Sequence, residues 1–110
     1  MRVTVSQENG ISVISIEGSI DGKTAPLVME EINPTLQAAQ SVILDLSKVG
    51  YVSSAGLRLL FLIYREFVAK KGRLVLLGVS ENIRRVMWYT GFLKFFTLAG
   101  SRAEAVQALS

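Results

Sequence analysis

Two adjacent serines, Ser53 and Ser54, are the residues whose type and position could support chemistry. They follow an apolar run at residues 41–44, which predicts a buried strand, and precede residues 57–71, which predict a helix of about four turns. A hydroxyl at a helix start can cap unpaired backbone N–H groups. Because the helix dipole places positive charge there, a phosphate on such a hydroxyl would also be stabilised.

Other residue types restrict the chemistry further. The chain has no histidine and no cysteine, which excludes a Ser-His-Asp or Cys-His triad. A zinc site would have to consist of carboxylates alone, so we expect neither a metal nor a cofactor. An enzyme with Ser54 as nucleophile would need a lysine or carboxylate base, and the sequence has no Gly-x-Ser-x-Gly elbow or glycine-rich phosphate loop. We therefore expect a binding protein and not an enzyme.

Length and composition are typical of one domain spanning residues 1–110. Half of the residues are hydrophobic and 19% are charged, which argues against disorder. No apolar run reaches the roughly 18 residues of a membrane span, and no signal peptide precedes the first strand, so we expect a cytoplasmic protein that does not bind membranes. Two basic clusters (Lys70, Lys71 and Arg73; Arg84 and Arg85) indicate solvated faces, or a surface for an acidic protein, rather than a nucleic-acid interface.

The pattern along the chain predicts strands alternating with helices. Residues 3–6 and 11–16 are expected to form a hairpin around Asn9-Gly10. Thr24 is expected to cap a helix that reaches Ala39, and Pro34 should kink or shorten it. Gly72 should end the helix of residues 57–71. The remaining elements are a buried strand at 74–77, a helix at 81–90 capped by Ser80, an edge strand after 92–98, and a helix at 102–109 capped by Ser101.

This alternation predicts the fold class. Helical crossovers between strands after residue 22 imply parallel pairing, whereas the opening hairpin is antiparallel. We expect an α/β domain with a mixed, mostly parallel sheet of four to five strands and about four helices.

The central segment also carries a family motif. Asp45-Leu46-Ser47, Val49, Ser54, Gly56 and Leu57 match the pattern Asp-Leu-Ser-x-Val-x-x-x-Asp-Ser-Ser/Thr-Gly-Leu. Residues 18–21 with 24–26, and residues 83–86 with 90–92, add two weaker matches in the same order. The chain thereby resembles the STAS domain family, in particular the bacterial anti-sigma factor antagonists, along nearly its whole length.

The resemblance implies a partner switch. In that family the unphosphorylated antagonist binds a serine protein kinase that is also an anti-sigma factor, and this binding releases the sigma factor. The kinase phosphorylates the serine that follows the motif's aspartate, and the antagonist is released. A serine phosphatase of the PP2C type resets it. By position the acceptor is Ser54, and the resemblance places Asp21, Ser53 and Gly56 at the partner-binding surface.

The chain departs from the motif on both sides of Ser54. Ser53 replaces the motif's aspartate, and Ala55 replaces its second hydroxyl residue. Losing the acidic neighbour should ease phosphorylation, but makes Ser53 a rival acceptor or a simple helix cap. Asp45 is expected to end its strand in an Asx turn. An alternative function is a constitutive STAS adaptor, for example in a transport assembly, in which Ser54 is never phosphorylated.

The predicted helix at 57–71 is apolar on more than one face. Leu57, Leu60, Phe61, Tyr64, Phe67 and Val68 form an expected core stripe. On the other side, Leu59, Leu62 and Ile63 would form the apolar centre of a docking surface, with Arg58 and Arg65 at its rim. The alternative is that these side chains pack against a neighbouring helix of the same domain.

Overall fold

Asn9 and Gly10 turn the chain back after its first strand, as predicted. In the computed structural model, which describes residues 1–110, both residues have positive φ, 52° and 80°, as a type I′ turn requires. The turn joins β1 (Arg2–Glu8) to β2 (Ile11–Glu17). The two strands pair antiparallel without interruption, from Arg2 opposite Glu17 to Glu8 opposite Ile11.

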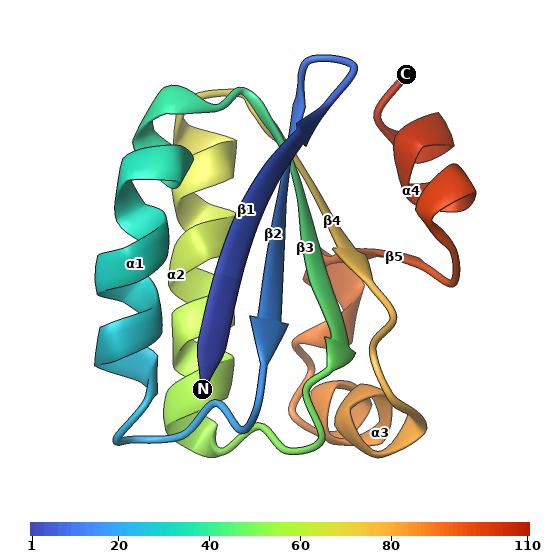
Figure 1. The fold of residues 1–110 in the computed structure, drawn as a ribbon. Helices are drawn as coiled ribbons and strands as arrows, with labels where there is room; N and C mark the ends of the chain where they lie inside the picture. Colours follow the sequence, from blue (N-terminus) through green and yellow to red (C-terminus); the bar gives the residue numbers. More distant parts are fainter.

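Three more strands extend the sheet in chain order. They are β3 (Ser41–Lys48), β4 (Arg73–Leu77) and β5 (Thr97–Ala99), and each pairs parallel with the strand before it. The order β1-β2-β3-β4-β5 leaves β1 and β5 at the two edges (Figure 1). The prediction of a mixed, mostly parallel sheet with four helices is confirmed, and the sheet has five strands.

Alternating side chains place a core on each face of the sheet. The larger core lies under α1 (Ala25–Ala38) and α2 (Ser54–Ala69), with Ile83 and Met87 added by α3 (Glu81–Tyr89). The smaller core packs under α4 (Arg102–Ala108) on the opposite face (Figure 1). Because α4 has only 7 residues, it leaves part of that face uncovered. No helix is long and apolar enough to cross a membrane.

Serine caps set two of the helix starts, as predicted. The Ser80 hydroxyl accepts a hydrogen bond from the Ile83 N–H at 3.3 Å, and the Ser101 hydroxyl accepts one from Glu104 N–H at 3.1 Å. Each cap satisfies a backbone donor that the helix itself cannot pair.

The end of α2 differs from the prediction. Lys71, and not Gly72, adopts the left-handed conformation that ends the helix, with φ of 58°. Gly72 is required for a different reason, because a Cβ on it would lie 2.8 Å from the Gln40 carbonyl oxygen. The glycine thus lets the start of β4 approach the end of α1 closely.

Of the two effects predicted for Pro34, a kinked or a shortened helix, the shortening is wrong. α1 continues through it to Ala38. Pro34 and Glu30 both lie on the exposed side of the helix. Water can therefore hydrate the Glu30 carbonyl that the missing N–H leaves without a helical partner.

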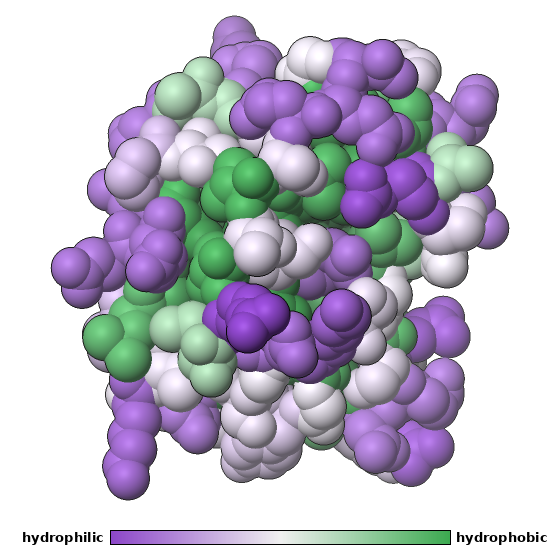
Figure 2. Space-filling view, in the orientation of Figure 1, coloured by the Kyte–Doolittle hydropathy of each residue, from purple (hydrophilic) through white to green (hydrophobic).

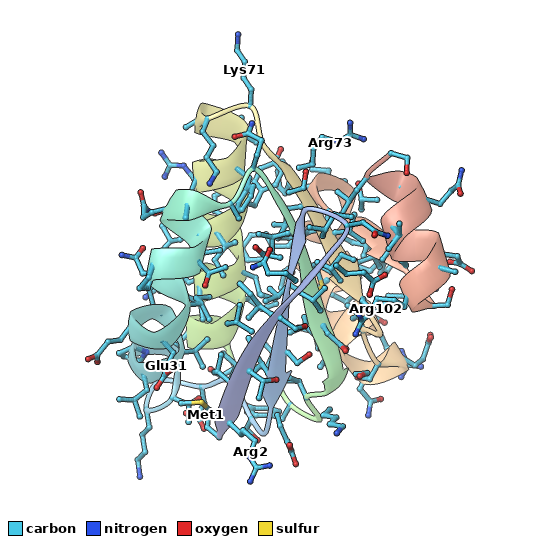
Figure 3. The ribbon with its side chains drawn as sticks, turned by 45° about the horizontal axis from the view of Figure 1, so that its top comes forward. Met1, Arg2, Glu31, Lys71, Arg73 and Arg102 are labelled. Atoms are coloured by element: carbon cyan, nitrogen blue, oxygen red, sulfur yellow. The ribbon has the colours of Figure 1, made fainter.

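The basic cluster at residues 70–73 lies far from the two serines. α2 has 16 residues and therefore spans about 24 Å between Ser54 and this cluster. Figure 3 shows Lys71 and Arg73 at one end of the molecule and Met1 and Arg2 at the other. The basic side chains of residues 70–73 are therefore too distant to contact a group on Ser54.

Candidate functional site at the start of α2

Ser53 is the cap of α2. Its backbone is extended, and its hydroxyl accepts a hydrogen bond from the Gly56 N–H at 3.3 Å. Its carbonyl accepts the first helical bond, from Leu57 N–H at 2.8 Å. The side chain is half-buried, so its hydroxyl is committed to the structure of the helix start.

Ser54 is the first residue of the helix and is exposed. Its hydroxyl makes no hydrogen bond within the protein, and the N–H groups of Ser54 and Ala55 are also unpaired. A free hydroxyl therefore lies beside two free backbone donors at the positive end of a helix of 16 residues. The two serines, equivalent by residue type, have separate structural roles.

A backbone clamp fixes this helix start to the loop after β2. Ile20 N–H donates to the Tyr51 carbonyl at 3.0 Å, and Ser53 N–H donates to the Ile20 carbonyl at 2.9 Å. Gly56 is buried beneath the clamp, where a Cβ would lie only 2.4 Å from the Ile20 carbonyl oxygen. Gly56 was expected at the partner-binding surface, but the structure buries it. It acts by letting α2 approach the loop.

Asp21 follows directly in the same loop and organises the start of α1. Its Oδ1 accepts hydrogen bonds from the N–H groups of Lys23 at 2.9 Å and Thr24 at 3.0 Å. These two bonds, the one from Thr24 being the larger cause, lower the pKa of Asp21 below its usual value. The carboxylate is therefore held as an anion in the loop adjoining Ser54.

Thr24 does not cap α1 with its side chain, contrary to the prediction. Its hydroxyl donates to the Ser19 carbonyl at 2.7 Å and accepts from Asp21 N–H at 2.9 Å. Because its hydroxyl is engaged by these two groups, the threonine closes the loop and does not cap the helix.

A shallow groove runs between the starts of α1 and α2, next to Ser54. Its hollow measures about 240 Å³ and is lined from α1 by Ala25 and Pro26, from the preceding loop by Gly22, and from α2 by Ala55, Arg58, Leu59 and Leu62. Leu62 is 44% exposed, and the Arg58 guanidinium has no ion-pair partner. The groove therefore combines an apolar floor with one free positive charge.

Of the three residues expected at the apolar centre of a docking surface, Leu59, Leu62 and Ile63, only Leu62 is exposed. Leu59 is 5% exposed and Ile63 is fully buried, and both belong to the larger core. Their side chains face the layer shared with α1, which was the alternative reading. The core stripe also ends early, since Val68 is 57% exposed.

Sequence reasoning missed the contribution of α1 to this groove. Ala25 and Pro26 line it, and Leu27 in the same turn is 51% exposed. Tyr51, in the loop before Ser53, is 57% exposed and was also missed. The sequence did carry a signal for this: Ala25, Pro26 and Leu27 are three consecutive apolar residues in the first turn of the helix.

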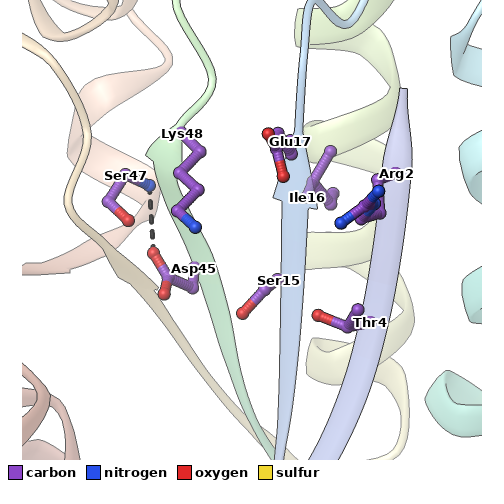
Figure 4. Close-up of a pocket in the computed structure, with 8 residues that line it drawn as sticks. All are labelled: Arg2, Thr4, Ser15, Ile16, Glu17, Asp45, Ser47 and Lys48. Carbon is purple, nitrogen blue, oxygen red and sulfur yellow. Dashed lines mark hydrogen bonds between the residues drawn. The ribbon is translucent and has the colours of Figure 1, made fainter.

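Asp45 lies outside this site. Its Oδ1 accepts from Ser47 N–H at 3.0 Å, as an Asx turn predicts, but β3 continues past it to Lys48. Figure 4 shows it on the uncovered face of the sheet, in a hollow of about 220 Å³. The hollow is lined by Arg2, Thr4, Ser15, Ile16, Glu17, Asp45, Ser47 and Lys48. This face is opposite the one that carries α2, so Asp45 supports the strand end and does not contact Ser54.

No three carboxylate side chains are grouped so that they could hold a metal ion. The start of α2 presents an exposed hydroxyl without a hydrogen bond, two free N–H donors, a neighbouring anion and an apolar groove. Such an arrangement is suited to binding and to regulation by charge.

Comparison with known proteins shows to which family the chain is related. The model of the STAS domain matches residues 2–105. The chain is 30% identical over 109 residues to the putative anti-sigma factor antagonist BtrV of Bordetella bronchiseptica, covering 98% of this chain and 94% of that protein.

Solved structures agree. An anti-sigma factor antagonist from Mycobacterium paratuberculosis is 28% identical and superposes with a TM-score of 0.89, covering 98% of this chain and 92% of that one. The phosphorylated form of the Bacillus cell fate determinant SpoIIAA, at 21% identity, shares the fold with a TM-score of 0.74 over 99% of this chain and all of that one. The chain belongs to the STAS domain family.

Proposed function

We propose that this protein is an anti-sigma factor antagonist that switches partners through Ser54. Unphosphorylated, it binds a serine protein kinase that is also an anti-sigma factor. Phosphorylation of Ser54 by that kinase ends the binding, and a serine phosphatase of the PP2C type restores it. The observation that supports this most strongly is the division of roles between the two serines, because only Ser54 has a free, exposed hydroxyl.

The surroundings of Ser54 suit a phosphate without loss of structure. The N–H groups of Ser54 and Ala55 are unpaired and can donate to phosphate oxygens. Arg58, one turn further along α2, has no ion-pair partner and lies on the same side of the helix. A phosphate carries about −1.5 to −2 charges at neutral pH, so these donors should hold it in place with α2 intact.

Release then follows from charge at the docking surface. In the unphosphorylated protein, Arg58 and the exposed Leu62 are available to a partner along the groove. A phosphate on Ser54 would attract Arg58 and add negative charge next to Asp21. A partner surface that pairs with Arg58 would lose that pairing and meet repulsion instead.

Binding measurements with the cognate kinase test the switch. Ser54→Ala should bind with the affinity of the unmodified protein and remain bound when ATP is added. Ser54→Asp should bind at least about tenfold more weakly, equivalent to about 1.4 kcal/mol. If both variants bind alike, the protein is a constitutive adaptor and not a switch.

A further inference from the structure

The outer edge of β1 is an unprotected sheet edge. β1 ends the sheet, and its seven residues keep an unbroken register with β2. It contains no proline, no lysine and no bulge. Proteins usually protect an edge strand with such features, because free N–H and C=O groups recruit another strand.

The hairpin turn determines which groups face outward. In a two-residue type I′ hairpin, the residues flanking the turn, Glu8 and Ile11, form a hydrogen-bonded pair. Bonding toward β2 then alternates along β1, so Val3, Val5 and Gln7 direct their N–H and C=O groups away from the sheet. These three residues form the available face of the edge.

An apolar strip accompanies this edge on the side of α1. Val5 is 43% exposed, and Val3 and Met29 are only partly buried against the larger core. Figure 2 shows hydrophobic side chains gathered between α1 and β1, bordered by hydrophilic ones. Another strand added at β1 would cover part of this strip.

The sequence of β1 is complementary to itself. If two copies pair antiparallel with Val5 at the twofold axis, Val5 faces Val5 and Val3 faces Gln7 of the other copy. The outward N–H and C=O groups of these three residues then pair with those of the other copy, which gives about six backbone hydrogen bonds between the two chains. In the same register Arg2 faces Glu8 of the other copy, twice. Arg2 has no ion-pair partner in its own chain, and Glu8 uses only Oε1, for Arg102 at 2.8 Å.

We propose that β1 pairs with β1 of a second copy about Val5, joining the two five-stranded sheets into one. A second copy is the expected partner of this edge, because one register pairs Arg2 with Glu8 and also pairs all the outward backbone groups. Moving the axis to Thr4 or Ser6 separates Arg2 from Glu8 and leaves some outward groups without a partner.

Single cysteines test the register directly, because the chain has no cysteine of its own. Val5→Cys should form a covalent dimer under mild oxidation, since hydrogen-bonded antiparallel pairs have Cα atoms about 5.5 Å apart. Thr4→Cys and Val3→Cys are matched controls that should remain uncoupled, because their equivalents lie farther apart. Equal coupling at Thr4, or none at Val5 in a protein with normal circular dichroism, would overturn the proposal.

Charge reversal gives a second test without oxidation. Arg2→Glu and Glu8→Arg each place like charges opposite one another, so each should raise the dimer dissociation constant by roughly tenfold at low salt. Mixing the two variants restores opposite charges and should yield a heterodimer by sedimentation equilibrium. A wild-type chain that is monomeric up to about 1 mM, or a mixture that associates no better than its components, would show that β1 does not pair with itself.

Discussion

Gly56→Ala should destabilise the domain through the clamp that positions Ser54. The new Cβ would lie 2.4 Å from the Ile20 carbonyl oxygen and 2.7 Å from Val52 Cγ1. Overpacking of this kind costs about 1–3 kcal/mol, and losing the bond from Ser53 N–H to Ile20 adds about 0.5–1.5 kcal/mol. The higher helix propensity of alanine offsets up to about 1 kcal/mol. We expect a net loss of about 2 kcal/mol.

Urea and thermal unfolding measure this loss. For a domain of this size, about 2 kcal/mol corresponds to a fall in Tm of about 8 °C. Gly50→Ala is the matched control, because its Cβ would meet nothing within 4 Å, and we expect it to change stability by less than about 1 kcal/mol. If Gly56→Ala is as stable as the wild type, α2 does not approach the Ile20 loop as closely as described.

Three further predictions address the same region. Ser53→Ala should lower the free energy of unfolding by about 1 kcal/mol, whereas Ser54→Ala should leave it unchanged, because only Ser53 caps α2; equal losses in urea unfolding would contradict this division. Leu62→Asp should weaken kinase binding at least about tenfold with little change in Tm, while Ile63→Asp should unfold the domain; a large fall in Tm for Leu62→Asp would place Leu62 in the core. The pKa of Asp21 is lower in the folded protein, so its stabilising contribution should be complete above its ordinary value of 3.8 and disappear as the pH falls through the folded pKa. The difference in unfolding free energy between wild type and Asp21→Ala, followed from pH 7 to pH 2, should shrink at acid pH; a difference independent of pH would show that the charge is not involved.

Local signals predicted much of the fold from the sequence. Ser80 and Ser101 each precede a helix and cap it, and Asn9-Gly10 forms the expected turn. These features depend on a few neighbouring residues and on backbone sterics. The alternation of strands and helices then fixed the parallel pairing, because crossovers between strands leave few other arrangements.

Features that depend on distant residues were not predictable in the same way. Leu59 and Ile63 are buried because α1 covers them, which the pattern of α2 alone does not reveal. Thr24 does not have its expected capping role because its hydroxyl bonds the Ser19 carbonyl and the Asp21 N–H instead. The requirement for Gly72 comes from the Gln40 carbonyl, more than thirty residues away in the chain.

For the proposed site, the sequence predicted a serine at a helix start but not the groove beside it. The motif predicts Ser54 as the acceptor, and the structure distinguishes it from Ser53 because only Ser53 caps the helix. The wall of the groove formed by Ala25 and Pro26 requires the packing of α1 beside α2, which no short motif encodes.

Mapping the phosphorylation site tests the central claim most directly. The protein, Ser53→Ala and Ser54→Ala would each be incubated with the cognate kinase and ATP, and the modified residue identified by mass spectrometry. We expect phosphate on Ser54 alone in the wild type and in Ser53→Ala, and none in Ser54→Ala. Phosphate on Ser53 with Ser54 unmodified would contradict the account.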